Sequence, residues 1–202
     1  MDNTVMAYVS RETQDRLEAY VDLIRKWNSR INLVSRSSLD DLWDRHIIDS
    51  AQIFELSHRA DRWADLGSGG GLPGLVLAIM ALEQDPARET ILVDSDQRKC
   101  AFLRTVAREL KLNATVLSER VETMDPLEAN VLSARALAPL TQLMAFAERH
   151  LEPGGHAFFP KGRNWGAEVD DARREWRFDL QAHPSATDSG AAILEIRDLQ
   201  RV

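Results

Sequence analysis

The chain contains very little cysteine, with Cys100 the only one in 202 residues. A single thiol forms no internal disulfide, and no Cys or His stands near it at the spacing of metal ligands, so the sequence predicts neither a disulfide scaffold nor a metal site. One unpaired cysteine is typical of proteins of the reducing cytoplasm, which is the expected location.

Long apolar runs and a secretion signal are also missing. Residues 1–10 have neither a basic start nor an apolar stretch. The longest mostly apolar run, residues 72–82, is too short to cross a bilayer. We therefore expect no association with a membrane.

The chain has fewer basic than acidic residues. It contains 25 Lys and Arg against 32 Asp and Glu, which gives a net charge of −7. Such a chain does not attract nucleic acid at long range, so any contact with RNA must be a local basic patch. Residues 25–38 hold four basic side chains and no acid, and residues 97–111 hold five against Glu109. Either window is equally typical of a solvated helix face.

Two helices are predicted before residue 61. Apolar residues at helical spacing predict an amphipathic helix over residues 14–27. A capping box at Ser38–Asp41 predicts that a second helix starts there and runs to about residue 58. We expect residues 1–60 to form a helical cap on one compact domain.

From residue 61 onward, short apolar runs alternate with helical ones, which predicts a mostly parallel sheet with helices on both faces. The expected strands are 62–66, 90–93, 114–117, 131–133 and 156–160. The expected helices are 74–82, 97–110 and 139–151. Two last runs, 178–183 and 191–196, flank a turn-rich segment and predict an antiparallel pair that ends the sheet. The core, residues 61–202, is thus predicted to be a Rossmann-like α/β fold.

A glycine-rich segment, residues 65–74, follows the first expected strand and opens a helix. Glycines allow a ligand close to the backbone, and the free N–H groups of a helix start favour an anion. Asp94 ends the second strand, 20 residues beyond Gly74, where an acid accepts ribose hydroxyls. Together they indicate an adenosine-type cofactor. The alternatives are a tight turn for the glycines and a helix cap for Asp94.

Two cofactors fit this segment. The spacing Gly69-x-Gly71-x-x-Gly74 matches a dinucleotide loop, whereas Asp65-x-Gly67-x-Gly69-x-Gly71 matches the loop of S-adenosylmethionine enzymes. A carboxylate at Asp65 repels a pyrophosphate and attracts an ammonium and a sulfonium, which favours S-adenosylmethionine. An NAD(P)-dependent oxidoreductase remains the alternative.

Further motifs stand in a defined order along nearly the whole chain. In the core they are residues 65–74, Leu92-Val93-Asp94-Ser95, Lys99 with Phe102-Leu103, Arg120-Val121-Glu122 and Ser133-Ala134-Arg135-Ala136. In the cap they are Trp27-Asn28, Asn32-Leu33 and Arg45-His46-x-x-Asp49-Ser50. In order and spacing they resemble the bacterial 16S rRNA guanine-N7 methyltransferases once called glucose-inhibited division protein B.

The resemblance implies a class I methyltransferase that acts on 16S rRNA or the small ribosomal subunit, and we expect a monomer. Family members often carry Phe where Leu72 stands, which changes an apolar wall of the pocket. With the glycine loop, the residues expected to bind S-adenosylmethionine are Asp65, Gly67, Gly69, Gly71, Leu72, Asp94, Val121, Glu122 and Arg135.

Guanine N7 has a lone pair and no proton, so its methylation needs no catalytic acid or base, and we assign none. Ser133-Ala134-Arg135-Ala136 stands where amine-methylating enzymes carry Asp/Asn-Pro-Pro-aromatic, which disfavours exocyclic-amine methylation. Cys100 lies inside an expected helix, which argues against a nucleophilic thiolate. A module that binds S-adenosylmethionine or RNA without catalysis is a further alternative.

The remaining polar residues of interest are candidates for RNA contact. We expect Arg135 to bind an RNA phosphate or the methionine carboxylate, with an ion pair to Glu122 or Asp94 as the alternative. His46 is either a hydrogen-bonded core histidine or a substrate contact. Lys161, Arg163 and Trp165 join cations to an aromatic that can stack on an unpaired base. The RNA-binding candidates are Arg30, Arg36, Arg45, His46, Lys161, Arg163 and Trp165.

Overall fold

The computed structural model describes residues 9–57 and 60–202. Its strands are β1 (Arg62–Leu66), β2 (Glu89–Val93), β3 (Ala114–Leu117), β4 (Ala129–Ala134), β5 (Leu151–Lys161), β6 (Trp176–Pro184) and β7 (Ala192–Arg201). They form a seven-stranded sheet in the order β3-β2-β1-β4-β5-β7-β6. The pairs from β3 to β5 are parallel, and β7 pairs antiparallel with both β5 and β6. The predicted sheet with its antiparallel C-terminal pair is confirmed.

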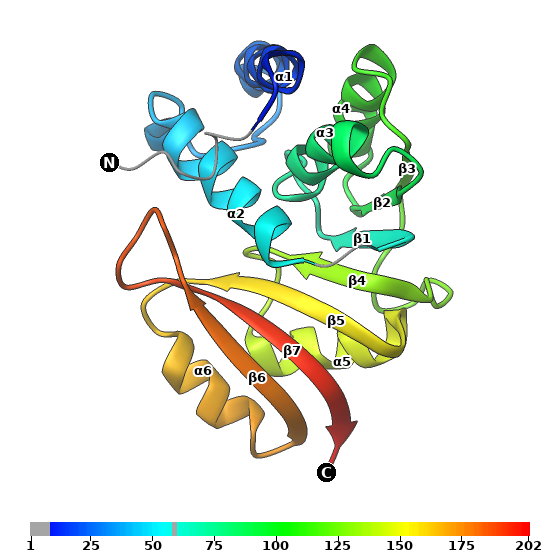
Figure 1. The fold of residues 1–202 in the computed structure, drawn as a ribbon, viewed down its shortest axis with the longest axis vertical. Coiled ribbons are helices and arrows are strands. Elements are labelled where there is room, and N and C mark those ends of the chain that lie inside the picture. Colours follow the sequence, from blue (N-terminus) through cyan, green and yellow to red (C-terminus); the bar gives the residue numbers. More distant parts are fainter. Residues whose placement is uncertain (1–8, 58–59) are drawn as a thin grey trace.

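Helices lie on both faces of this sheet (Figure 1). They are α1 (Arg11–Asn28), α2 (Asp49–Leu56), α3 (Gly74–Gln84), α4 (Gln97–Glu109), α5 (Leu140–His150) and α6 (Trp165–Ala172). One hydrophobic cluster joins α1, α2, α3 and α4 to one face, and a second joins α5 and α6 to the other. The two clusters take alternate residues of the strands: Trp63 faces the first and Ala64 the second.

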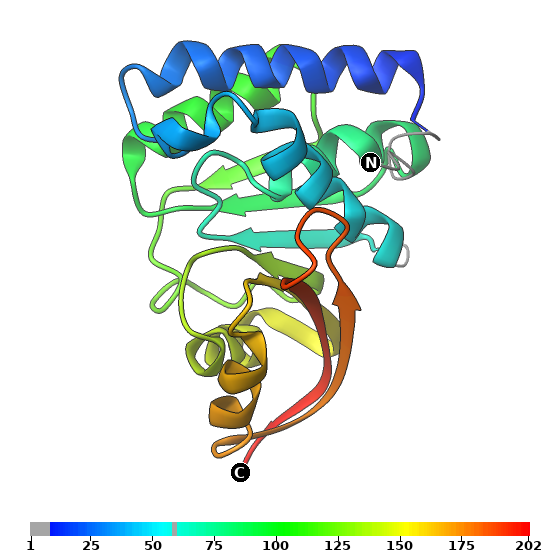
Figure 2. The ribbon, with the colours of Figure 1, turned by 90° about the vertical axis from the view of Figure 1, so that its left-hand side faces the viewer.

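The first helix packs on the core with the face that its apolar spacing predicts. Ser10 caps its start, because the Ser10 hydroxyl accepts a hydrogen bond of 3.2 Å from the Thr13 amide. Its buried residues include Tyr20, and Trp27 meets the Phe102 ring of α4 edge to face at 5.6 Å. Figure 2 shows α1 lying across α3 and α4. The cap and the core therefore share one hydrophobic interior.

The expected start of the second helix is wrong. The Ser38 hydroxyl donates to the Ser35 carbonyl oxygen at 2.9 Å within a 3-10 turn (Arg36–Ser38), so it caps no helix. Helical structure follows later, as a π-helical segment, η3 (Trp43–Ile48), that continues directly into α2. Residue 58 of the expected helix, like residues 1–8 of the N-terminal segment, lies outside the described residues.

Two elements of the C-terminal half also differ from expectation. Strand β5 begins at Leu151, directly after α5, and not at residue 156. Helix α6 was not expected; it buries only Val169 and Ala172, which is too little apolar periodicity to stand out in the sequence. Across residues 9–57 and 60–202, no helix is long and apolar enough to cross a membrane.

Candidate functional site

The glycine loop leaves the carboxyl end of β1 in a conformation that requires glycine. Gly67, Gly69 and Gly71 have φ angles of 65°, 56° and 90°, in the left-handed region that side chains disfavour. A Cβ atom at Gly67 would lie 2.6 Å from Leu137 Cδ1, and one at Gly74 would lie 2.6 Å from Asp65 Oδ2. The loop is thus a tightly packed bare-backbone turn, as ligand loops at this edge of an open sheet are.

Asp65 supports this loop from the interior. Its carboxylate is fully buried, accepts a hydrogen bond of 2.7 Å from the Ser133 hydroxyl at Oδ1 and one of 3.2 Å from the Gly74 amide at Oδ2. Trp63 Nε1 donates to Ser133 Oγ at 3.0 Å, so three side chains are linked by hydrogen bonds. Burial raises the pKa of Asp65 to about 6, although the bonds from Ser133, Ser68 and Gly74 and the Arg135 charge lower it. Asp65 therefore shapes the loop from behind.

The start of α3 offers fewer free donors than expected. The Gly74 amide is taken by Asp65, and the Leu75 amide donates to the Gly71 carbonyl oxygen at 2.8 Å. Leu72, expected in an apolar wall of the pocket, is buried in the hydrophobic cluster beneath the cap. The sequence signal locates the loop correctly, but these two N–H groups serve the fold.

Asp94 joins the end of β2 to the glycine loop. Its Oδ2 accepts from the Gly69 amide at 2.8 Å, and its Oδ1 accepts from the Asp96 amide at 2.8 Å. The cap of α4 is Asp96, whose side chain accepts from the amides of Arg98 and Lys99. The alternative that Asp94 is only a helix cap is therefore wrong. Each Asp94 oxygen keeps a second lone pair for a ligand.

Val121 and Glu122 lie in the loop between β3 and β4, and the end of α5 holds this loop. His150 Nε2 lies 2.9 Å from the Val121 carbonyl oxygen, and Arg149 donates to the Met124 carbonyl oxygen through Nε at 3.1 Å. Burial lowers the pKa of His150, so the ring is neutral and its Nε2 is the donor to Val121. The sequence did not point to Arg149 or His150, because neither belongs to a recognisable motif.

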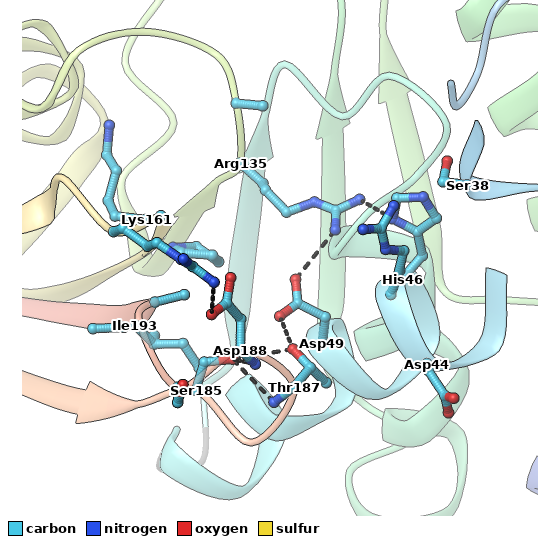
Figure 3. A pocket seen from close by; sticks show the side chains of 18 of the residues that line it. Ser38, Asp44, His46, Asp49, Arg135, Lys161, Ser185, Thr187, Asp188 and Ile193 are labelled. Atoms are coloured by element: carbon cyan, nitrogen blue, oxygen red, sulfur yellow. Dashed lines mark hydrogen bonds and ion pairs between the residues drawn. The ribbon is translucent and has the colours of Figure 1, made fainter. Parts of the chain in front are cut away.

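A pocket of about 940 Å³ lies at the carboxyl ends of β4 and β5, facing η3 and the β6–β7 loop. Figure 3 shows its side chains. Its charged lining comprises the basic residues Arg45, Arg135, Lys161 and Arg163 and the acidic residues Asp44, Asp49, Glu168 and Asp188. The volume is in the range of sites for small molecules, and the mixed charge suits a ligand with both donors and acceptors.

Arg135 forms an ion pair, but with neither of the partners considered as the alternative to a ligand. Its guanidinium donates to Asp49 Oδ2 at 3.2 Å and lies 3.1 Å from His46 Nδ1 (Figure 3), and it meets neither Glu122 nor Asp94. Arg135 is only a donor, so His46 Nδ1 accepts and Nε2 carries the proton. Burial and the charges of Arg135 and Arg45 lower the pKa of His46 to about 4, which keeps the ring neutral.

Asp49 also connects the cap to the β6–β7 loop. Its Oδ1 accepts from Thr187 Oγ1 at 3.0 Å, and Gln52 Oε1 accepts from the Ala186 amide at 2.9 Å. Both ribbon views show this loop against α2 (Figures 1 and 2). The loop is therefore a docked wall of the pocket.

The pocket brings together Arg45, His46, Lys161 and Arg163 of the RNA-binding candidates. Lys161 Nζ is held inside, by the Ala138 carbonyl oxygen at 2.9 Å and Glu168 at 2.8 Å, whereas the Arg163 side chain is 80% exposed. The other candidates lie outside the lining: Arg30 and Arg36 are exposed on the cap, and the half-buried Trp165 begins α6 and packs on the core. In the part of the chain that the structure describes, no group of His, Cys, Asp or Glu could hold a metal.

Comparison with solved structures finds proteins of the same fold. Solved structures with a similar fold include the 16S rRNA methylase RmtB, with 19% identity and a TM-score of 0.56 over 95% of this chain and 76% of that one. A SAM-dependent methyltransferase from Aquifex aeolicus matches with 12% identity and a TM-score of 0.59 over 89% of this chain and 97% of that one. At such identities the likeness extends to the fold alone.

Sequence relatives are far more similar. The ribosomal RNA small subunit methyltransferase G of Ruegeria pomeroyi is 55% identical over 194 residues, which is 96% of this chain and 95% of that protein. The protein of the same name from Paracoccus denitrificans is 56% identical over 95% of this chain and 98% of its own length. The family model described as rRNA small subunit methyltransferase G matches residues 13–196. The chain therefore belongs to the rRNA small subunit methyltransferase G family.

Proposed function

We propose that this chain transfers the methyl group of S-adenosylmethionine to N7 of one guanosine in the 16S rRNA of the small ribosomal subunit. One observation carries the proposal: the segment after β4 joins two sites. Its Leu137 side chain packs on Gly67 of the glycine loop, while Arg135 and Ala136 line the pocket of about 940 Å³. A donor at the loop and a base in the pocket would thus meet at the end of β4.

The residues at the glycine loop fit this donor. The left-handed backbone of Gly67, Gly69 and Gly71 has no side chains to exclude it, and Asp94 retains acceptor capacity for the ribose hydroxyls. Val121 and Glu122 would form the wall held by His150. The charge of Arg135 would face the anionic part of the donor or an RNA phosphate.

The donor supplies, when bound, an electrophilic methyl group on a sulfonium. Guanine N7 carries a lone pair and no proton, so this chain's residues need only hold and orient the base. Such orientation contributes on the order of 7–11 kcal/mol to a reaction between two partners. His46 is neutral, and its Nε2 is buried without a hydrogen-bond partner among the described residues, so we assign it no proton transfer.

RNA contact falls to the exposed cations around the pocket. Arg45 is exposed at its lining, and Arg30 and Arg36 extend basic charge along the cap. These side chains would hold the phosphates on either side of the target nucleotide. We infer that the enzyme acts as a monomer. We also infer that it works in the cytoplasm, where an unpaired cysteine such as the buried Cys100 is typical. The reaction itself calls for no metal, since N7 is already a nucleophile.

Labelled S-adenosylmethionine with naked 16S rRNA and with small ribosomal subunits tests the proposal. We expect label on one guanosine, at which aniline cleaves after borohydride reduction, as it does at N7-methylguanosine. Binding of S-adenosylhomocysteine without transfer to either RNA would indicate a binding module. Binding of NADH without binding of S-adenosylhomocysteine would indicate an oxidoreductase.

A further inference from the structure

Two loops place an acidic and a basic side chain together at the pocket. Arg163 follows β5, Asp188 lies between β6 and β7, and Arg163 NH2 is 3.5 Å from Asp188 Oδ1. Both side chains line the pocket and both are partly exposed, at 80% and 46%. An ion pair so exposed contributes little to stability, so its position at the pocket needs another explanation.

Gly190 holds both members of the pair in place. Its amide donates to Asp188 Oδ1 at 2.9 Å, which orients the carboxylate. A Cβ atom at Gly190 would lie 2.5 Å from Arg163 Cγ, so the stem of the arginine rests on bare backbone. The loop itself is docked on α2 through Gln52 and Ala186. The pair is therefore positioned before any ligand arrives.

The other carboxylates near the pocket interior already bind protein donors. Asp49 accepts from Arg135, Gln52 and Thr187 through its two oxygens, and Glu168 accepts from Lys161 and from the Leu140 amide through Oε2. Asp188 Oδ2 has no hydrogen-bond partner within residues 9–57 and 60–202. In Figure 3 the Asp188 carboxylate points toward the part of the pocket where Arg135 lies, whereas the Asp44 side chain points away from the other labelled side chains. Asp188 thus offers a carboxylate oxygen to a ligand in the pocket.

The order of these groups has a chemical meaning. Arg163 NH2, Asp188 Oδ1 and Asp188 Oδ2 present a donor followed by two acceptors, as the pairing edge of cytosine does. Guanine complements this pattern with O6, N1–H and the N2 amino group, whereas adenine offers N1 as an acceptor against the carboxylate.

We propose that Arg163 and Asp188 read the Watson–Crick edge of the target base and so restrict this enzyme to guanine. This inference rests on the proposed function and adds the residues that select the base. Recognition from this edge leaves N7 free on the other edge of the ring, where the methyl group must arrive. The base must be unpaired in the bound RNA, because the protein takes the place of its partner.

The first test compares Asp188→Asn with Asp170→Asn, an exposed carboxylate on α6 away from the pocket. We expect Asp188→Asn to lower kcat/KM for 16S rRNA by about 10-fold or more, the effect of losing a bidentate base contact. Binding of S-adenosylhomocysteine should stay at the wild-type value in both variants, and Asp170→Asn should keep wild-type transfer. Full transfer by Asp188→Asn would overturn the inference while leaving the proposed function intact.

The second test separates base reading from a structural role of the loop. The mapped guanosine is replaced by inosine, which lacks only the N2 amino group, in 16S rRNA rebuilt by ligation. The wild type should prefer guanosine by about 5-fold or more. Asp188→Asn should lose or reverse this preference. The Gly190 amide would bind the oxygen of the new asparagine side chain, and the asparagine NH2 group would then face the N2 amino group of guanine. An equal loss on both RNAs would mean that Asp188 only maintains the loop, and would overturn the inference.

A second variant guards against a misfolded loop. Arg163→Met keeps the stem that rests on Gly190 and removes the donor for O6. We expect a lower kcat/KM on guanosine and on inosine alike, because both bases carry O6, with the preference for guanosine retained. An unchanged kcat/KM would exclude Arg163 from base reading. A wild-type enzyme that transfers no methyl group would instead refute the proposed function.

Discussion

The hydroxyl of Tyr20 on α1 donates a hydrogen bond of 2.5 Å to the carbonyl oxygen of Gly70, in the glycine loop 50 residues away. The bond is buried, and burial raises the pKa of Tyr20 well above its usual range, so the phenol keeps its proton. Leu33 of the cap packs against Gly70 as well. The cap thus forms part of the wall that fixes the loop.

Removal of this hydroxyl should weaken both the fold and the site. Tyr20→Phe leaves a buried carbonyl oxygen without its donor, which costs about 1–3 kcal/mol of unfolding free energy. Urea denaturation measures the loss, and titration with S-adenosylhomocysteine should show weaker binding. Thr105→Val removes an exposed hydroxyl that bonds the Ala101 carbonyl oxygen within α4, and should leave binding unchanged. Wild-type affinity in Tyr20→Phe would show that the loop holds its shape without the cap.

The raised pKa of Asp65 predicts a pH-dependent stability. The pKa is about 6 in the folded chain against an ordinary 3.8, so the folded state binds this proton more tightly than the unfolded state does. The contribution of Asp65 is therefore fully present below about pH 4 and is lost as the pH rises through 6. The unfolding free energy of Asp65→Asn relative to the wild type should accordingly increase from pH 4.5 to pH 7. Parallel stability curves in urea over this range would contradict the raised pKa.

The contacts of Arg135 predict that lysine cannot replace it. Arg135→Lys keeps the charge but loses the planar fork that reaches Asp49 and His46 together. Since this fork ties the end of β4 to the cap at the pocket, we expect kcat/KM for 16S rRNA to fall by about 10-fold. Arg174→Lys, in a surface pair with Asp171, is the matched control and should behave as wild type. Unchanged transfer together with unchanged donor binding in Arg135→Lys would remove Arg135 from the site.

The exposed cations of the cap predict a salt dependence of RNA binding. Each phosphate contact on single-stranded RNA contributes about −0.7 to the slope of log affinity against log salt concentration. The double variant Arg30→Ala, Arg36→Ala should therefore reduce the slope by about 1.4. Arg174→Ala with Arg177→Ala removes two exposed cations near β6 and should leave it unchanged. A wild-type slope in the variant that lacks Arg30 and Arg36 would show that the cap does not contact the RNA phosphates.

Several features of the fold depend only on residues that are near neighbours in the chain. Strands β1 to β4, α3, α4 and the glycine loop agree with the sequence prediction to within a few residues, because alternation of apolar residues and glycine spacing are local properties. The helix start at Ser38 was predicted from equally local residues and was wrong. A serine hydroxyl has several backbone partners within reach, and the Ser35 carbonyl oxygen takes this one.

The amino-acid sequence alone therefore determined the sheet, the loop that begins at its first strand, the acid at the end of the second and the family of the chain. Tertiary packing alone decided that Tyr20 binds the glycine loop, that Arg135 pairs with Asp49 and that Arg163 pairs with Asp188. The physical reason is one of distance along the chain. A residue's place in a helix or strand depends on its neighbours, but the choice among many acids as the partner of an arginine depends on which elements the folded core brings together.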